Sequence, residues 1–262
     1  MKLYGKTGTW HCSRYARAAK NKYKMSNFTK NELIRYSRQL MLPGMGLKGQ
    51  EKFKNAKVLV IGAGGLGCPV LQYLCAAGVG TIGIVDFDTI ELHNLHRQIL
   101  YTAEDVGKSK ATVATQKLKE QNPHLVLKEH NLLFNADNAA DLIQQYDIIM
   151  DGSDNFETRY LVNDTCVKFN KPLVYGSIFK YEGQAAVFNY KGSKHLRDIY
   201  PEAPHAKDVP SCSETGVIGA IPGVIGTLMC TMAFEIIQEQ FNNLNTLHIF
   251  NFKEYSMQKL VF

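Results

Sequence analysis

The sequence lacks any uninterrupted apolar run close to the roughly 20 residues that a membrane span requires, so no membrane partner is expected. Its six cysteines form no regular framework, which argues against a disulfide-stapled scaffold and favours a reducing, cytoplasmic location. Internal repeats and low-complexity tracts are also absent. With 262 residues, of which 45% are apolar, the chain has the composition of a globular protein with one large core.

Acidic residues are absent from residues 1–24, which contain seven basic residues and account for the net charge of +6. The rest of the chain carries 23 basic and 24 acidic residues, so its body is nearly neutral and no nucleic-acid partner is expected. We interpret residues 1–27 as a basic extension outside the fold, disordered or without function. A transit-like segment and a true translation start at Met25 are the alternatives.

A glycine-rich turn joins the apolar run 58–61 to a helix-like segment. Its glycines are Gly62, Gly64, Gly65 and Gly67. Glycine lets the backbone approach a phosphate closely, and the amides at a helix start face the anion. The next apolar run ends at Asp86, 24 positions after Gly62, where an acidic side chain suits a ribose hydroxyl. This order predicts a nucleotide site; a glycine turn that binds nothing is the alternative.

Cationic and amide side chains follow the acidic residue, which is not typical of a dehydrogenase. A dinucleotide site needs backbone amides and a helix dipole, whereas attack on a triphosphate spreads more charge and usually requires Arg and Lys. Arg97 offers a planar fork for phosphate oxygens, Lys110 a point charge and Asn94 an amide donor. Any one of them could be a solvated surface group, but their grouping predicts a triphosphate site.

Several motifs recur in the order in which one protein family carries them. They are Arg35-Tyr36-Ser37-Arg38-Gln39, the glycine turn, Asp86-Phe87-Asp88, Asn94-Leu95-His96-Arg97-Gln98, Asp151-Gly152-Ser153-Asp154-Asn155, Glu182-Gly183-Gln184, Gly216-Val217-Ile218-Gly219 and Gly223-Val224-Ile225-Gly226. On these motifs, about residues 28–262 resemble the ThiF/MoeB/HesA family, bacterial relatives of ubiquitin-activating enzymes. The resemblance implies a single adenylyltransferase domain. Such enzymes use ATP and magnesium to adenylate the C-terminal Gly-Gly carboxylate of a small β-grasp sulfur-carrier protein.

The resemblance also implies roles for individual residues. Nucleotide binding falls to the glycine turn and to Asp86, Asp88, Asn94, Arg97, Lys110, Asp154 and Asn155. Asp154 would coordinate magnesium, and Arg38 would act in the partner subunit's site, because the family forms homodimers with shared sites. Physical reasoning supports the role that the resemblance implies for Asp154. This residue follows a buried-type strand, and a hard cation prefers carboxylate and phosphate oxygens together. For Asp151 a turn or capping role is preferred.

The chain departs from the family pattern at the zinc site. Many members carry two Cys-x-x-Cys pairs, which are missing here; His195 and His205 are interpreted as loop residues, and no zinc is expected. Cys212 precedes a helix start, where a thiolate is favoured, and is interpreted either as a catalytic or sulfur-linked residue or as an ordinary loop residue. We expect residues 191–213 to form a mobile crossover that clamps the carrier's tail.

The periodicity predicts an α/β fold with a Rossmann-like doubly wound sheet, mostly parallel, with an antiparallel C-terminal extension. Helices are expected at 31–42, 67–77, 108–121, 136–145, 156–169 and 223–240, and strands at 57–61, 81–86, 125–130, 147–151, 172–176, 184–190, 247–252 and 256–262. The remaining cysteines with apolar, helix-like surroundings are expected to pack in the core: Cys68, Cys75, Cys166 and Cys230.

Two other classes of function remain open from the sequence. An NAD-dependent Rossmann oxidoreductase should lack the Asn94, Arg97 and Lys110 set. A catalytically silent interaction subunit typically loses the arginine or the magnesium aspartate, whereas this chain retains Arg38 and Asp154. Within the enzyme class, a molybdopterin carrier, a thiamine carrier, another sulfur carrier and a peptide all present a C-terminal carboxylate, and the sequence distinguishes neither the acceptor nor the source of sulfur.

Overall fold

The computed structural model of the chain describes residues 27–204 and 216–262. Within this part of the chain, eight strands form one sheet in the order β3-β2-β1-β4-β5-β6-β7-β8. They are β1 (Lys57–Ile61), β2 (Thr81–Val85), β3 (Val126–His130), β4 (Ile148–Asp151), β5 (Leu173–Phe179), β6 (Glu182–Phe188), β7 (Thr246–Asn251) and β8 (Ser256–Val261). Neighbours are parallel from β3 to β5 and antiparallel from β5 to β8, which confirms the predicted fold class.

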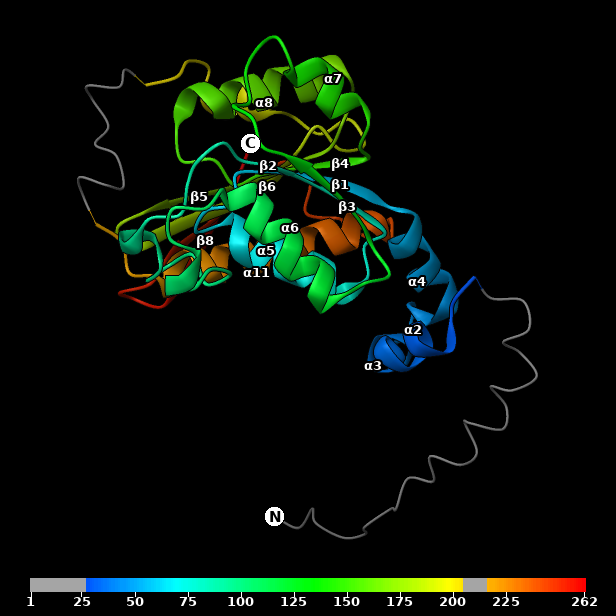
Figure 1. The fold of residues 1–262 in the computed structure, drawn as a ribbon. Helices are drawn as coiled ribbons and strands as arrows, with labels where there is room; N and C mark the ends of the chain where they lie inside the picture. The colour runs from blue at the N-terminus through cyan, green and yellow to red at the C-terminus, as the bar shows by residue number, and fades with distance from the viewer. Residues whose placement is uncertain (1–26, 205–215) are drawn as a thin grey trace, which may run out of the picture.

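The helices cover both faces of this sheet. Figure 1 shows α7 and α8 over one face, α5, α6 and α11 over the other, and α2 to α4 at one end. Their bounds are α2 (Lys30–Arg35), α3 (Ser37–Leu40), α4 (Gly46–Asn55), α5 (Gly67–Ala77), α6 (Lys110–Gln121), α7 (Ala139–Gln144), α8 (Phe156–Lys168), α9 (Leu196–Ile199) and α11 (Ala220–Ile237), with short 3-10 turns at Leu92–Asn94 and Ala103–Asp105.

The central strand β1 explains why its sequence is a continuous apolar run. Val58 and Val60 point into the core under α5, α6 and α11, whereas Leu59 and Ile61 point into the core under α7 and α8. Because successive side chains of a strand alternate between the two faces, a strand covered on both faces must be apolar at every position.

Helix α11 is the only helix in the described ranges that is long and apolar enough to cross a membrane, with 18 residues and a mean hydropathy of 1.7. It packs against α5, β5 and β6, and Ile225, Met229 and Ala233 on it are fully buried. Its apolar composition is therefore accounted for by contacts in the core.

The single helix expected over residues 31–42 is wrong, because the chain breaks into α2 and α3 at Tyr36. The Tyr36 ring is buried, and its hydroxyl accepts a hydrogen bond of 2.9 Å from Asn122 Nδ2. Helix α4 was not predicted. Gly46 and Gly49 lower its helix propensity, but Gly49 and Phe53 are buried, and tertiary packing decides its structure.

The other expected elements agree with the observed ones to within three residues at each end. Residues 191–204, expected to be part of a weakly anchored loop, contain the short helix α9 and the buried side chain of Leu196. The second half of that expected loop, with His205 and Cys212, lies largely outside the described residues.

Candidate active site

A cavity of about 910 Å³ lies at the carboxyl ends of β1, β2 and β4. Because β1 separates β2 from β4 in the sheet, the strand order reverses here, and open α/β sheets bind ligands at such a position. From the residues predicted for the site, the cavity is lined by Gly62, Gly64, Gly65, Asp86, Asp88, Arg97, Lys110, Asp154 and Asn155. The structure therefore brings together most of the residues that the sequence placed in four separate motifs, together with Lys110.

The glycine turn is built by close backbone contacts. Gly62 has a φ of +88°, which favours glycine, and a Cβ there would lie only 2.8 Å from the Gly152 carbonyl oxygen. At Gly67 a Cβ would overlap the carbonyl oxygen of Gly62. Helix α5 begins at Gly67, directly after the turn, so its positive end is next to the cavity and favours an anionic ligand.

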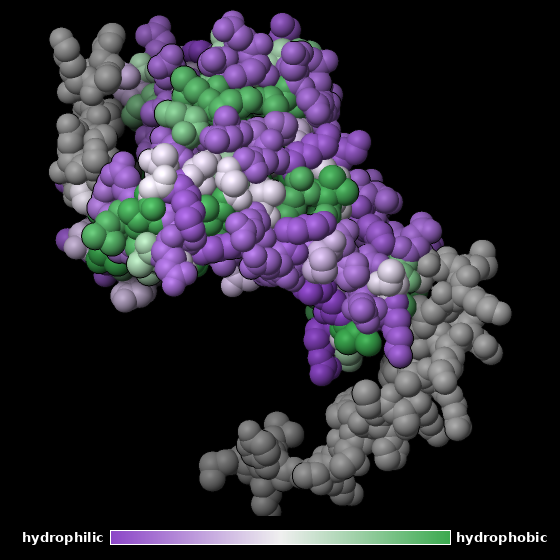
Figure 2. All heavy atoms as spheres, viewed as in Figure 1, coloured by the Kyte–Doolittle hydropathy of each residue, from purple (hydrophilic) through white to green (hydrophobic). Residues whose placement is uncertain are grey.

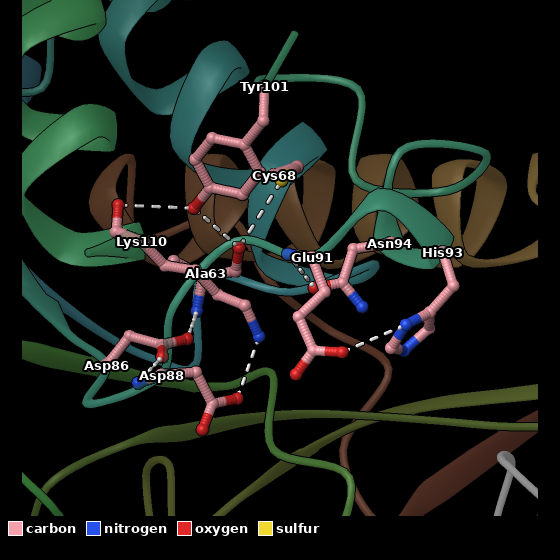
Figure 3. A network of polar contacts seen from close by, with 9 residues as sticks. All are labelled: Ala63, Cys68, Asp86, Asp88, Glu91, His93, Asn94, Tyr101 and Lys110. Atoms are coloured by element: carbon pink, nitrogen blue, oxygen red, sulfur yellow. Dashed lines mark hydrogen bonds and ion pairs between the residues drawn. The ribbon is translucent and has the colours of Figure 1, made fainter. Parts of the chain in front are cut away.

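Asp86 directly follows β2 and is held by backbone amides on both of its oxygens (Figure 3). Its Oδ2 accepts a hydrogen bond of 2.7 Å from Ala63 N, and its Oδ1 accepts one of 2.9 Å from Asp88 N. The pKa of Asp86 is raised above its usual value, because the effect of burial outweighs the nearby Lys110 ammonium and the two amides, which lower it. The carboxylate thus ties the loop after β2 to the glycine turn after β1.

Lys110 is the first residue of α6, and its side chain is only 7% exposed. Its Nζ lies 2.7 Å from Asp88 Oδ2, as Figure 3 shows. The Tyr101 hydroxyl lies within hydrogen-bonding distance of two carbonyl oxygens, 2.9 Å from that of Ala63 and 3.3 Å from that of Lys110. Lys110 is therefore fixed at the cavity wall, where phosphate oxygens and Asp88 would share its ammonium group.

Arg97 lines the cavity, and its Nη1 donates a hydrogen bond of 3.1 Å to the His93 carbonyl oxygen. The same nitrogen lies 2.9 Å from His96 Nε2. Asn94, which was predicted to bind phosphate, is buried and does not line the cavity. Its Oδ1 accepts a hydrogen bond of 3.1 Å from Glu91 N, which shapes the turn that carries Arg97.

Asp154 and Asn155 follow β4 and are both exposed at the cavity. Asn155 caps α8, since its Oδ1 accepts a hydrogen bond of 2.8 Å from Thr158 N. Asp151 has the preferred turn role: its Oδ1 accepts hydrogen bonds from Ser153 N at 2.9 Å and Ser153 Oγ at 2.6 Å. Of the two aspartates in residues 151–155, Asp154 is the one that lines the cavity.

Arg159 is a cavity residue that sequence reasoning missed. It is buried, and its Nε lies 3.4 Å from Asp151 Oδ2. Its Nη1 donates a hydrogen bond of 3.1 Å to Ser177 Oγ, and its Nη2 donates to the carbonyl oxygens of Ser153 at 3.0 Å and Gly176 at 3.3 Å. The sequence feature that could have indicated this role is an arginine one turn into the helix that follows Asp154. Arg159 connects the loop after β4 to β5.

Arg38 and Cys212 are also predicted to act in the site. Arg38 is exposed on α3 and does not line the cavity. Cys212 lies outside the described residues, as does His205, so the expectation of no zinc stays a prediction. Within residues 27–204 and 216–262, no group of three or more His, Cys, Asp or Glu side chains is placed to hold a metal ion.

The four cysteines expected to pack in the core are buried, as predicted: Cys68, Cys75, Cys166 and Cys230. Burial raises the pKa of the Cys68 thiol to about 12 and that of the Cys75 thiol to about 11. It also raises the pKa values of Cys166 and Cys230. These thiols stay protonated at neutral pH and are therefore poor nucleophiles.

Comparison with known proteins gives a match to the model of the ThiF family over residues 36–261. A sulfur carrier protein adenylyltransferase of Thermus thermophilus is 48% identical over 215 residues, which cover 80% of this chain and 79% of that protein. The probable adenylyltransferase/sulfurtransferase MoeZ of Mycobacterium tuberculosis is 50% identical over 216 residues, 81% of this chain and 55% of that protein. The chain thus spans about half the length of MoeZ.

The adenylyltransferase and sulfurtransferase MOCS3 of Xenopus laevis is 46% identical over 211 residues, which cover 80% of this chain and 47% of that protein. Among solved structures, the crystal structure of Escherichia coli MccB with ATP has a TM-score of 0.75 at 23% identity. It covers 95% of this chain and 78% of that chain, and the likeness shows the fold.

Proposed function

Since the chain belongs to the ThiF family, we propose that it activates the C-terminal carboxylate of a small sulfur-carrier protein with ATP. The domain that it shares with its curated relatives is an adenylyltransferase domain. The acceptor, the release of pyrophosphate and the use of magnesium are our proposals. The acceptor would be a β-grasp protein ending in Gly-Gly, of the kind that serves molybdopterin or thiamine synthesis.

One observation carries the proposal: a single cavity combines an anion-binding glycine turn, an aspartate suited to ribose, two cations and an exposed carboxylate. An NAD oxidoreductase needs the turn and the aspartate but has no use for Arg97 and Lys110 beside them. A catalytically silent subunit would have no use for the complete set.

In the proposed reaction, an oxygen of the carrier's carboxylate attacks the α-phosphorus of ATP. The bond from that phosphorus to the bridging oxygen breaks, and pyrophosphate leaves with the electron pair. No general base is required, because the carboxylate is already ionised at neutral pH. Catalysis therefore consists of alignment and charge stabilisation, with Arg97 and Lys110 on the phosphates.

Asp154 fits the magnesium ion that this chemistry uses. Its carboxylate lines the cavity, and no hydrogen bond to it is found among the residues that the structure describes. Magnesium in phosphoryl-transfer sites is typically held by one or two carboxylates together with phosphate oxygens and water, so one aspartate suffices. When bound, the ion would neutralise phosphate charge.

The experiment that tests the proposal is ATP–pyrophosphate exchange with each candidate carrier from the same organism. We expect exchange with one full-length carrier and none with the same carrier lacking its two terminal glycines, since that deletion removes the reacting carboxylate. Exchange that is indifferent to the deletion, or absent with every carrier, would refute the proposed acceptor.

We also propose a homodimer in which Arg38 reaches the partner's ATP. Arg38 is exposed on α3 and does not line the cavity of its own chain, and the neighbouring Ile34, Met41 and Leu42 are each more than half exposed. Figure 2 shows hydrophobic residues at this end of the molecule. An exposed apolar surface of this kind is typical of an interface, and a twofold dimer would cover the same surface on both copies.

Mixing two inactive variants tests this assembly. Arg38→Ala and Asp154→Ala chains should each be nearly inactive, but a mixed dimer has one site with both residues intact. Random exchange of subunits places half of the chains in mixed dimers, so about a quarter of wild-type exchange activity should return. An active monomer in solution, or no recovery after verified subunit exchange, would contradict the shared site.

Cys212→Ser separates the two interpretations of this residue. We expect pyrophosphate exchange to stay within about twofold of wild type, because attack by an ionised carboxylate needs no thiol. Transfer of sulfur to the carrier is the second measurement. Its loss would identify Cys212 as the nucleophile, and its survival would identify an ordinary loop residue. Loss of exchange itself would show that Cys212 takes part in adenylation.

A further inference from the structure

Residues 191–204, here called the arm, connect β6 to the wall of the cavity. At its end, Ala203 and Pro204 line the cavity. The arm is held at its middle by α9, where Leu196 is buried and its backbone N donates a hydrogen bond of 2.9 Å to Asn163 Oδ1 of α8. The position of this wall therefore depends on how the arm is attached to α8.

Tyr160 of α8 makes the attachment closest to the cavity. Its hydroxyl lies 2.9 Å from the carbonyl oxygen of Tyr200 and 2.8 Å from that of Glu202. Tyr160 is buried, with 6% of its surface exposed, whereas Tyr200 and Glu202 are exposed residues, so the two bonds are partly buried. Removal of the hydroxyl would take away both bonds at once, and with them this attachment of the arm.

Arg197 makes a second attachment. Its Nε and Nη2 donate hydrogen bonds of 2.8 and 2.7 Å to the two carboxylate oxygens of Asp164, and its Nη1 donates one of 2.7 Å to the Pro201 carbonyl oxygen. Its guanidinium lies 4.8 Å from the centre of the Tyr160 ring. Because the pair is partly exposed, it should contribute less than Tyr160, although its two-bond geometry is specific.

The arm lies at the end of the cavity opposite to the nucleotide residues. The glycine turn and Asp86 follow β1 and β2, whereas Ser177 and Phe179 belong to β5, on the other side of β4. The Gln184 side chain of β6, which lies beyond β5, is near the Tyr200 hydroxyl of the arm. A chain terminus that attacks the α-phosphorus must enter from the side that the nucleotide leaves open.

We propose that Tyr160 and Arg197 are positioning residues for the acceptor. Through the backbone of residues 200–202 they hold Ala203 and Pro204 as one wall of the path along which the carrier's tail reaches the α-phosphorus. This rests on the proposed function, and it assigns the two residues to the acceptor and not to ATP. Neither residue touches the reacting atoms.

Tyr160→Phe is the sharpest test, because it removes only the hydroxyl and keeps the ring in the core. In pyrophosphate exchange we expect the KM for the carrier to rise by about fivefold or more, with kcat and the KM for ATP within about twofold of wild type. Arg197→Lys, which keeps the charge but loses the two-bond geometry, should raise the carrier's KM by a smaller factor.

Tyr146→Phe is the matched control. Tyr146 lies in the same hydrophobic core, and its hydroxyl lies 2.9 Å from His130 Nε2, but it does not line the cavity. Its loss should leave both KM values unchanged. Equal changes in the KM values for carrier and ATP, no change in either, or the same effect from Tyr146→Phe would each overturn the proposal.

Trypsin gives a readout that does not depend on the acceptor. Lys194 and Arg197 are cleavage sites within the arm. Tyr160→Phe should be cut there several-fold faster than wild type and Tyr146→Phe, because a loosened arm opens more often. If wild type activates no carrier, the proposed function fails, while unchanged cleavage of Tyr160→Phe would refute the attachment itself.

Discussion

Arg97→Ala is expected to lower carrier-dependent ATP–pyrophosphate exchange by at least about a hundredfold, as is usual when one preorganised charge-stabilising donor is removed. The Arg97 guanidinium lines the cavity, and its Nη1 is already held by the His93 carbonyl oxygen and His96 Nε2. It therefore needs little rearrangement when charge develops on the phosphates. The loss should appear mainly in kcat, because the charge on the leaving pyrophosphate grows in the transition state.

Arg97→Lys is the informative companion variant. It keeps a positive charge but cannot offer two parallel donors, so its activity should lie between those of wild type and Arg97→Ala. Thermal unfolding of each variant should match wild type closely, since Arg97 belongs to no ion pair in residues 27–204 and 216–262. Near-wild-type exchange by a folded Arg97→Ala enzyme would remove Arg97 from the mechanism.

Arg159→Met is expected to lower the free energy of unfolding by about 3–5 kcal/mol, the usual cost of removing one partner of a buried pair. The substitution leaves Asp151 fully buried with only its two hydrogen bonds from Ser153. It also removes the link from the loop after β4 to Ser177 and Gly176 of β5. Urea denaturation monitored by circular dichroism measures the change.

A double variant shows whether charge is the cause. Arg159→Met combined with Asp151→Leu removes both charges, and we expect it to be less destabilised than Arg159→Met alone. Lys168→Ala, an exposed substitution on the same helix, should change stability by less than about 1 kcal/mol. A double variant that loses the sum of the two single effects would show that the pair does not act as a unit.

Local chain geometry explains why several predicted residues line the cavity. The glycine turn and Asp86 are separated by one βα unit, and that unit forces them together at one edge of the sheet. Strand positions followed from apolar runs, because a strand covered on both faces has no polar position to interrupt the pattern. For this part of the site, spacing along the chain determines position in space.

What the sequence did not reveal depends on contacts between distant segments. Arg159 has its role because it contacts β5, and Tyr160 because it contacts the arm. No local sequence pattern in α8 indicates either contact. Phosphate binding by Asn94 stays a prediction, and its burial and its hydrogen bond from Glu91 N could not be read from its neighbours in the sequence. Helix α4 forms although its two glycines disfavour a helix, because its buried face packs on the core.

The close approach of Gly62 to Gly152 has a mechanical consequence. At this contact the loop after β1, which would hold the phosphates, lies against the loop after β4, which carries Asp154, with main chain facing main chain. Backbone atoms cannot relieve a close contact by a change of rotamer, so a displacement of one loop must displace the other loop as well. The distance between the nucleotide site and Asp154 is therefore set by the backbone. We expect side-chain substitutions on the outer surfaces of the covering helices to leave this distance unchanged.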